Sequence, residues 1–307
     1  MIYPDDVPVL TDGVATLRPH RDSDIDAMVE MCNDSEFVRW TSVPTPYGDA
    51  QARGFIEDVV RPGWEHHQHR GWAIEYVDDD GRARFGGNID VRGMPVADVG
   101  FGLHPDARGR GLMTRAIRLA VAWSFENDVE VVHWRSHVGN VASLRTAWSS
   151  GFSLHGTTPG FLHERGKVLD AWTGSIRPGD DGSPRTKWWA TPVLTGDGVR
   201  LRPMAKRDIP RIVEGCSDPS TTHWVPTMTD RHTEEGARAF LASDVYRAAV
   251  GAVVSWCIAD PDTDTLLGNI SVLRINERTA TGEIGYWAHP DARGRGVVAE
   301  AARLVVR

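Results

Sequence analysis

The chain has 307 residues, of which 41% are hydrophobic and 25% are charged, a composition typical of a globular protein with room for two domains. No apolar run approaches the ~20 residues of a membrane span, and the N-terminus lacks the basic start and apolar centre of a signal peptide. The net charge of −8 argues against broad nucleic-acid binding, and the three cysteines have neither disulfide nor zinc spacing. We therefore expect a cytoplasmic protein that binds no nucleic acid, no membrane and no metal.

The first elements along the chain are predicted from hydrophobic spacing and turn residues. Residues 14–18 are expected to form a strand, and Asp22 or Ser23 is expected to cap the helix that follows. The further predicted segments are a helix at about 49–60 and a strand hairpin, 72–77 and 85–91, with a solvated aspartate tip at 78–80.

Residues 98–123 read as a strand, a tight turn and a helix. Hydrophobic side chains alternate up to Leu103, and a proline directly after His104 ends the strand. Arg108-Gly109-Arg110-Gly111 then begins a helix. Glycines let backbone N–H groups approach a ligand, and a helix N-terminus adds partial positive charge. This stretch predicts a phosphate-binding turn.

Downstream of this helix we expect a strand at 130–136, a helix from Gly139-Asn140 to Gly151-Phe152, and two strands at 153–156 and 168–175. His66, His67 and His69 are interpreted as a polar loop, because metal ligands must converge from a fixed geometry. His104 and His289 each precede a proline, and we expect them to shape the turn.

The chain contains the same pattern twice. Residues 283–296 repeat residues 98–111, 185 positions later, and a period this long indicates a duplicated domain. We predict a complete first domain at 1–177, a linker at 178–192 whose tryptophans pack on a domain, and a second, incomplete domain at 193–307. We expect a native chain longer by about 55 residues, or a partner that covers the open sheet edge.

The turn resembles the pyrophosphate-binding motif of the GNAT acyl-CoA N-acyltransferases, R-x-x-G-x-G/A after a strand, which Arg108 and Gly111 match. Gly111-Leu112-Met113-Thr114 and the ending Asn140-x-x-Ser143…Gly151-Phe152 are similar to the RimJ/RimL branch. The resemblance covers most of the first domain. It implies an α/β (α+β) fold of two tandem GNAT domains, each with a mixed central sheet flanked by helices.

The resemblance also implies roles for individual residues. Asp98, and Glu283 in the second copy, stand where related enzymes place a carboxylate base, and Ser143 substitutes for a tyrosine acid that is Ala147 here. Each has a simpler structural reading: Asp98 as a strand-edge charge, Asn140 as a helix cap, and Ser143 as a first-turn hydroxyl. The residues expected to contact acetyl-CoA are Gly102, Leu103, Arg108, Gly109, Arg110, Gly111, Leu112, Met113, Thr114 and Asn140, with Arg293, Gly294, Arg295, Gly296 and Val297 in the second copy.

These assignments imply transfer of an acetyl group from acetyl-CoA to a primary amine by direct attack in a ternary complex. The acceptor is a protein N-terminal α-amine or a small-molecule amine such as an antibiotic. The alternative is a pseudoenzyme that binds acyl-CoA and acts as a sensor or assembly domain. The second copy as given is expected not to catalyse, and the oligomeric state stays open, a homo-oligomer included.

Overall fold

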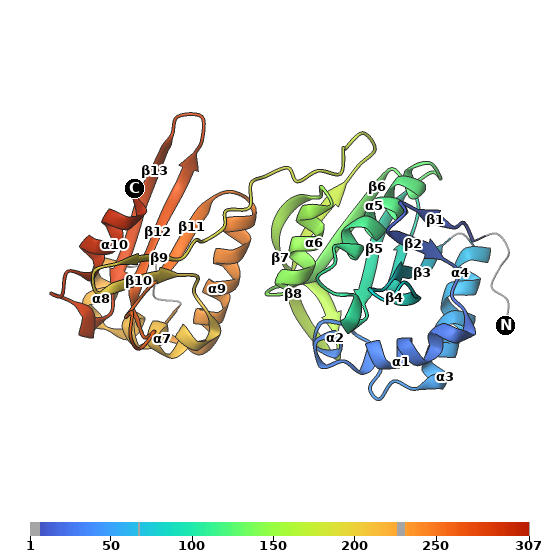
Figure 1. Ribbon diagram of the computed structural model, residues 1–307, viewed down its shortest axis with the longest axis horizontal. Coiled ribbons are helices and arrows are strands. Elements are labelled where there is room, and N and C mark those ends of the chain that lie inside the picture. Colours follow the sequence, from blue (N-terminus) through green and yellow to red (C-terminus); the bar gives the residue numbers. More distant parts are fainter. Residues whose placement is uncertain (1–6, 67, 226–230, 307) are drawn as a thin grey trace. The chain divides into compact units, whose positions relative to one another are not determined.

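The computed structural model describes residues 7–66, 68–225 and 231–306 (Figure 1). The chain forms two compact units, Met1–Arg185 and Thr186–Arg307. The boundary between the units falls inside the predicted linker, so residues 178–185 belong to the first unit and residues 186–192 to the second. Arg118 and Arg185 donate to the carbonyls of Gly182 and Gly151 within the first unit, while Trp189 Nε1 donates to Gly251 O in the second. Trp189 therefore packs on a domain, as expected.

The first unit is built on one mixed sheet; among its described strands, β5 and β6 pair in parallel and all other neighbours are antiparallel. Its strand order is β1-β2-β3-β4-β5-β6-β8-β7. The strands are β1 (Leu10–Thr11), β2 (Ala15–Arg18), β3 (His69–Val77), β4 (Ala83–Arg92), β5 (Val96–Leu103), β6 (Val131–His137), β7 (Ser153–Glu164) and β8 (Lys167–Ile176).

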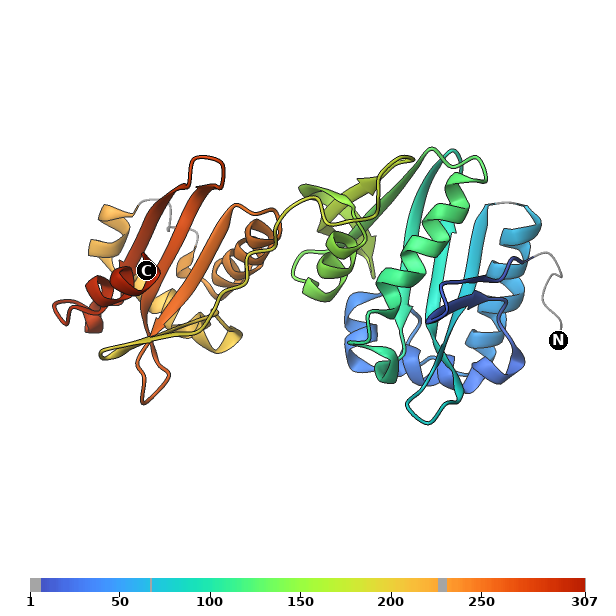
Figure 2. The same cartoon turned by 45° about the horizontal axis from the view of Figure 1, so that its top comes forward.

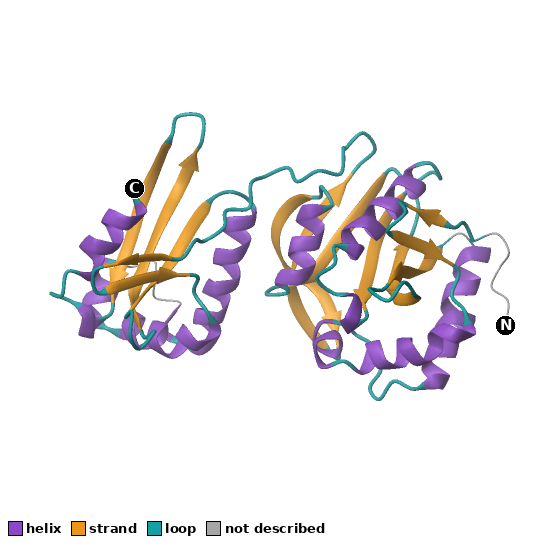
Figure 3. Cartoon of the chain, viewed as in Figure 1, coloured by secondary structure: helices purple, strands orange, loops and turns teal. Residues whose placement is uncertain are grey.

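Helices flank this sheet on both faces (Figures 2 and 3). Trp123 of the long helix α5 packs edge-on against Trp72 of β3, whereas Phe37 of α2 lies against Gly102 on the opposite face. The helices are α1 (Ile25–Asn33), α2 (Ser35–Trp40), α3 (Asp49–Gly54), the π-helical η2 (Phe55–Val60), α4 (Arg61–Glu65), α5 (Leu112–Phe125) and α6 (Val141–Ser149), with 3₁₀ turns η1 (Asp22–Asp24) and η3 (Pro105–Ala107).

The second unit contains an antiparallel sheet in the order β13-β12-β11-β10-β9. Its strands are β9 (Leu194–Gly196), β10 (Val199–Arg202), β11 (Val253–Ala259), β12 (Leu266–Asn276) and β13 (Thr281–Ala288). Its helices are α7 (Ile209–Ser217), α8 (Pro219–Trp224), α9 (Glu234–Ala249) and α10 (Val297–Val305), with 3₁₀ turns η4 (Lys206–Asp208) and η6 (Pro290–Ala292). The described part ends at Val306, directly after α10, and holds no counterpart of β6, α6, β7 or β8.

The two units share the same strand register. In the first, Ile89 of β4 pairs with Trp72 and Phe101, and in the second the equivalent Ile270 pairs with Trp256 and Tyr286. Position-for-position comparison of the sheets is therefore valid. The sequence repeat reflects two copies of one β-meander that leads into a turn and a helix.

A buried ion pair anchors the start of each unit. Arg18 of β2 donates two hydrogen bonds to Asp24, at 2.8 and 2.9 Å, and its Nε donates to Glu75 at 2.6 Å. The side chains of Arg18 and Asp24 are only 4% and 3% exposed. Arg202 and Asp208 repeat the pair in the second unit, with distances of 2.8 Å. This is the reason that arginine and aspartate recur in the sequence with the same spacing.

The structure corrects several sequence expectations. Neither Asp22 nor Ser23 caps α1: Asp24 occupies the N-cap position, and its carboxylate accepts from the Arg21 N–H instead. The helix expected at 49–60 continues as α4 to Glu65, and β7 extends to Glu164 rather than ending at 156. Long-range packing determines these boundaries, which local spacing does not reveal.

The Arg18–Asp24 pair predicts a stability effect. Asp24→Asn removes the carboxylate that accepts two hydrogen bonds from the buried Arg18 guanidinium and leaves only Glu75 as its counter-charge, so we expect the free energy of unfolding to fall by about 3 kcal/mol. Urea denaturation of the full chain measures this change. Asp49→Asn is the matched control, because Asp49 pairs with Arg53 at 2.7 Å but is 62% exposed. Its loss should stay below about 1 kcal/mol. Equal losses in both variants would contradict the anchoring role.

Candidate active site

The central feature of the first unit is a split between two neighbouring strands. β5 and β6 pair only from Val96↔Val131 to Asp98↔His133. Beyond that point β5 stays paired with β4 as far as Leu103, and β6 stays paired with β8 as far as His137. Along the split, β5 still pairs with β4 and β6 still pairs with β8, but β5 and β6 no longer pair with each other. Backbone groups on both inner edges are thereby left for an extended ligand.

The split opens into a cleft with a volume of about 720 Å³. Its lining residues come from both strands, from α2 and α6, and from the far end of β7. The lining residues include Phe37, Trp40, Arg92, Gly102, Leu103, Arg108, Met113, Arg135, His137, Asn140, Ser143, Phe161 and Glu164.

The glycine turn, residues 108–114, lies between β5 and α5. Gly109 and Gly111 have φ of 76° and 72°, a left-handed conformation that L side chains rarely adopt. A Cβ added at either glycine would meet no atom within 4 Å, so the space above the turn is open. The first N–H groups of α5 have no intrahelical acceptor, and they carry the positive end of the helix dipole. The turn thus suits an anionic group such as a pyrophosphate.

The arginines around the turn are already engaged with the protein. Arg108 donates to Asp34 at 2.5 Å and Arg115 to Asp12 at 2.7 Å, while Arg110 donates two bonds to Asp79, at 2.8 and 3.0 Å. The hydrogen bond from Arg110 lowers the pKa of Asp79. Asp79, which was expected to be only a solvated hairpin residue, therefore holds a side chain of the turn. Backbone N–H groups remain the principal donors for a phosphate.

Asn140 and Ser143 lie together at the start of α6, on the cleft wall. Asn140 Oδ1 accepts from the Ser143 N–H at 3.2 Å, so Asn140 is the helix cap. Ser143 Oγ accepts from Trp134 Nε1 at 3.0 Å. Because the hydroxyl oxygen accepts this bond, its proton is free to be donated into the cleft. The capping role and a proton-donor role are compatible.

Asp98 occupies the last paired position of β5, where the split begins. Its carboxylate lies 3.7 Å from Arg135 Nη2 and is 35% exposed. The described residues that line the cleft do not include Asp98.

An acid–base pair that was not predicted from the sequence lies within the cleft itself. His137 Nε2 and Glu164 Oε2 are 2.9 Å apart, and both residues line the cleft. The two positions are far apart in the chain, and the prediction ended β7 well before Glu164. Residues 157–164, TTPGFLHE, contain Pro159 and Gly160 and no alternation of polar and apolar side chains, so local sequence gave no signal for the longer strand.

The second unit keeps the turn but changes the surroundings. Gly294 and Gly296 have φ of 75° and 74°, and Arg293 donates to Asp218 at 2.5 Å, as Arg108 does to Asp34. Trp287, however, stands at the register position of Gly102 and is 5% exposed. Glu283 pairs with Arg274 at 2.7 Å.

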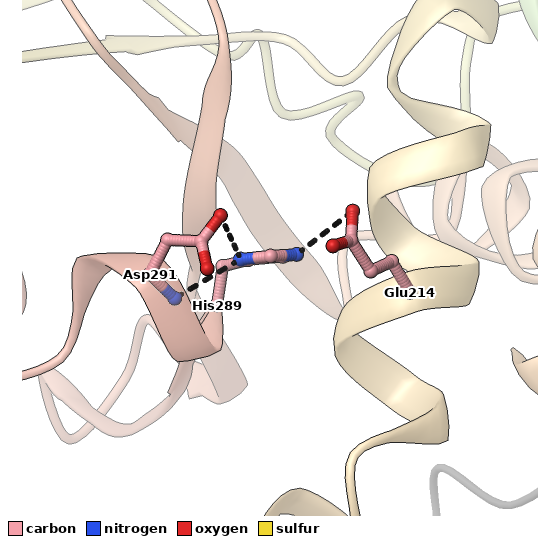
Figure 4. Close-up of side chains that lie close together, drawn as sticks. All are labelled: Glu214, His289 and Asp291. Carbon is pink, nitrogen blue, oxygen red and sulfur yellow. Dashed lines mark hydrogen bonds and ion pairs between the residues drawn. The ribbon is translucent and has the colours of Figure 1, made fainter.

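One group of side chains in the described residues has the composition of a metal site. It consists of Glu214, His289 and Asp291 (Figure 4). The carboxylates lie on opposite sides of the imidazole, 3.4 Å from Nε2 and 3.6 Å from Nδ1. Arg211 Nη1 lies within 3.1 Å of Glu214 and 3.0 Å of Asp291, so a guanidinium already bridges both carboxylates. We interpret the group as an ion-pair network.

The histidine of this network shapes the turn. His289 Nδ1 accepts from the Asp291 N–H at 3.3 Å, and His104 makes the same bond to Asp106. Both histidines are buried, as expected of a structural role. Of the predicted histidine loop, His67 lies outside the described residues, while His69 belongs to β3 and lies 3.6 Å from Asp90.

No helix in the described ranges is long and apolar enough to cross a membrane. The chain resembles Mycobacterium smegmatis RimJ in complex with CoA-disulfide, with a TM-score of 0.50 and 16% identity over 60% of this chain and 93% of that one. It is also similar to the ribosomal-protein-S5-alanine acetyltransferase of Vibrio fischeri (TM-score 0.47, 18% identity, 58% and 100% covered). A third similar structure is the microcin C7 self-immunity acetyltransferase MccE (TM-score 0.49, 18% identity, 54% and 93% covered).

The family model described as "Acetyltransferase (GNAT) domain" matches the chain twice, at residues 15–153 and 199–307. The matches cover both copies of the strand–turn–helix unit described above. This chain is therefore an acyltransferase of the GNAT family, and the family's domain occurs in it twice in tandem.

Proposed function

We propose that the first domain, residues 1–177, transfers an acetyl group from acetyl-CoA to a primary amine in the β5–β6 cleft. The carrying observation is the split strand pair that ends at an open glycine turn. The pantetheine arm would pair with the free strand edges, and the pyrophosphate would bind the N–H groups of the turn. The RimJ relative in complex with CoA-disulfide supports the same class of ligand.

The chemistry follows from the groups around the cleft. The acetyl carbonyl is assigned to the N–H group of Leu103, which would stabilise the oxyanion during attack. The His104 N–H donates to Gly86 O on the β4 side, and N–H groups alternate along a strand, so that of Leu103 faces the cleft and that of Gly102 does not. An alkylammonium must lose a proton before its nitrogen attacks, so a base is required. The C–S bond then breaks, and the leaving thiolate accepts a hydrogen bond from the Ser143 hydroxyl. The proton that the base took from the amine, relayed through solvent, converts the thiolate to the thiol.

We assign the base to the His137–Glu164 pair and keep Asp98 as the second candidate. If Nε2–H donates to Glu164, Nδ1 of His137 can accept the proton of the amine, and the carboxylate then stabilises the imidazolium. Asp98 would act through water, at the closed end of the split where β5 and β6 stop pairing. The position of the pair in the cleft favours it over Asp98.

We propose that the second domain does not catalyse in the chain as given. Its glycine turn has the geometry to bind a phosphate, but Trp287, which is 5% exposed, fills the position of Gly102. A binding-only role, the alternative reading for the whole chain, therefore fits the second domain better than the first. The acceptor is a protein N-terminal α-amine or a small-molecule amine.

The first prediction concerns the glycine turn. Gly111→Val places a branched side chain at φ 72°, in the space proposed for the phosphates. We expect the affinity for acetyl-CoA to fall more than tenfold, or about 1.4 kcal/mol, in isothermal titration calorimetry. Gly179→Val is the control, because Gly179 has φ 88° and open space but lies outside the cleft. Unchanged affinity in a folded Gly111→Val variant would show that the turn is not the phosphate site.

The second prediction separates the two base candidates. Glu164→Gln and His137→Asn should each lower kcat by about 100-fold or more while the Kd for acetyl-CoA stays within twofold. Asp98→Asn should have a much smaller effect, and Ser143→Ala should slow turnover moderately. Steady-state kinetics across pH, paired with calorimetry, measures these changes. A large loss in Asp98→Asn with nearly normal turnover in Glu164→Gln would reverse the assignment.

A further inference from the structure

The cleft contains two arginines that neither the phosphate turn nor the proposed acid–base groups require. Arg92 ends β4 and Arg135 lies on β6, and both line the cleft. They approach it from the two strands that flank β5, with Phe161 and Trp40 as neighbouring aromatic walls. The guanidinium of Arg135 lies 5.8 Å from the centre of the Phe161 ring.

Arg92 is oriented by a buried carboxylate. Its Nε lies 2.8 Å from Asp90 Oδ2, and its Nη2 lies 2.6 Å from the point that a Cβ on Gly100 would occupy. The guanidinium therefore extends over Gly100 of β5. Burial raises the pKa of Asp90, while the nearby Arg92 guanidinium lowers it. Within the described residues, the terminal nitrogens of Arg92 make no side-chain hydrogen bond, so they can donate to a ligand.

Arg135 is similarly available. Its nearest carboxylate is Asp98, 3.7 Å away, which exceeds the length of a hydrogen bond. The side chains of Arg92 and Arg135 are 44% and 38% exposed, and both can therefore be reached from solvent. The acidic residues that line the cleft, Glu36 and Glu164, have partners of their own in Trp40 and His137.

The second unit supplies an internal comparison. His69, Arg92 and Asp98 are neighbours across β3, β4 and β5. The same register positions across β11, β12 and β13 hold Val253, Leu273 and Glu283. Ser271 replaces Asp90, so the arginine and the carboxylate that orients it are both absent from the second copy. The meander folds and the glycine turn forms without them.

We propose that the acceptor of the first domain is an amine that also carries an anionic group, a carboxylate or a phosphate, bound between Arg92 and Arg135. This inference rests on the proposed acetyl transfer at the same site. Guanidinium groups present paired N–H donors that match both anions. Gly100 lies two residues, roughly 7 Å, before Gly102 along β5, so the anion stands several bonds from the attacking nitrogen. An acidic side chain of a peptide or a phosphorylated amine has this length, whereas a free α-amino acid is too short.

The test compares matched pairs of acceptors that differ only in the anionic group. One arm uses the C-terminally amidated dipeptides Ala-Glu and Ala-Gln, and the other uses phosphoethanolamine and ethanolamine. We expect the wild-type chain to prefer the anionic member in kcat/KM by more than tenfold in at least one arm, which also identifies the anion. Arg92→Gln combined with Arg135→Gln should remove that preference, while the Kd for acetyl-CoA stays within twofold.

Arg84→Gln is the matched control, because Arg84 lies on the same strand and is 50% exposed but pairs with Asp78 at the other end. It should keep the wild-type preference. Turnover of neutral and anionic acceptors at equal kcat/KM would overturn the inference and leave the acetyl transfer intact. Absence of turnover with every amine would count against the proposed function. In that case, equilibrium dialysis of the anionic members against the CoA-saturated chain decides: loss of binding in the double variant supports the site, and equal binding overturns it.

Discussion

The architecture of the first domain depends on the point at which β5 and β6 cease to pair. Strands inside a sheet normally satisfy their backbone N–H and C=O groups by pairing with a neighbour on each side. Unpaired backbone groups between two such strands are costly unless water or a ligand covers them. Here β4 and β8 hold the two strands apart, because each pairs with its neighbour along the full length of the split. The glycine turn at the end of β5 and the capped start of α6 after β6 are placed at the open end by this geometry.

Charges in the domain are divided between holding the fold and facing the cleft. Arg18 and Asp24 are buried and satisfy each other, and the arginines of the turn are tied to Asp12, Asp34 and Asp79. These pairs fix the loops on either side of the turn, while the backbone supplies the donors for an anion. The uncommitted donors stand elsewhere, on β4 and β6.

Much of this organisation could be predicted from the sequence, for reasons that are local. Gly109 and Gly111 need positive φ, the strand before them alternates, and a repeat 185 residues later shows the duplication directly. The cap at Asp24, the pair of Arg110 with Asp79 and the pair of His137 with Glu164 could not be predicted in this way. The two pairs join residues 31 and 27 positions apart, and they form only after strand register is set. Asp98 and Ser143 were placed by resemblance, and the structure puts Ser143 on the cleft wall and Asp98 at its edge.

The shared register of the two meanders has a consequence for the history and engineering of the chain. Because β3–β5 and β11–β13 align residue by residue, an exchange at one position changes a side chain without moving the backbone that carries it. Each copy is therefore a reference background for the other, within one polypeptide. The buried arginine–aspartate pair is the same in both copies, whereas glycine at 102 corresponds to tryptophan at 287. A Cβ at Gly102 would collide with the Phe37 ring, so this difference requires a coupled change on the helix that faces the sheet. The same register correspondence identifies the positions at which residues of the first copy can be introduced into the second.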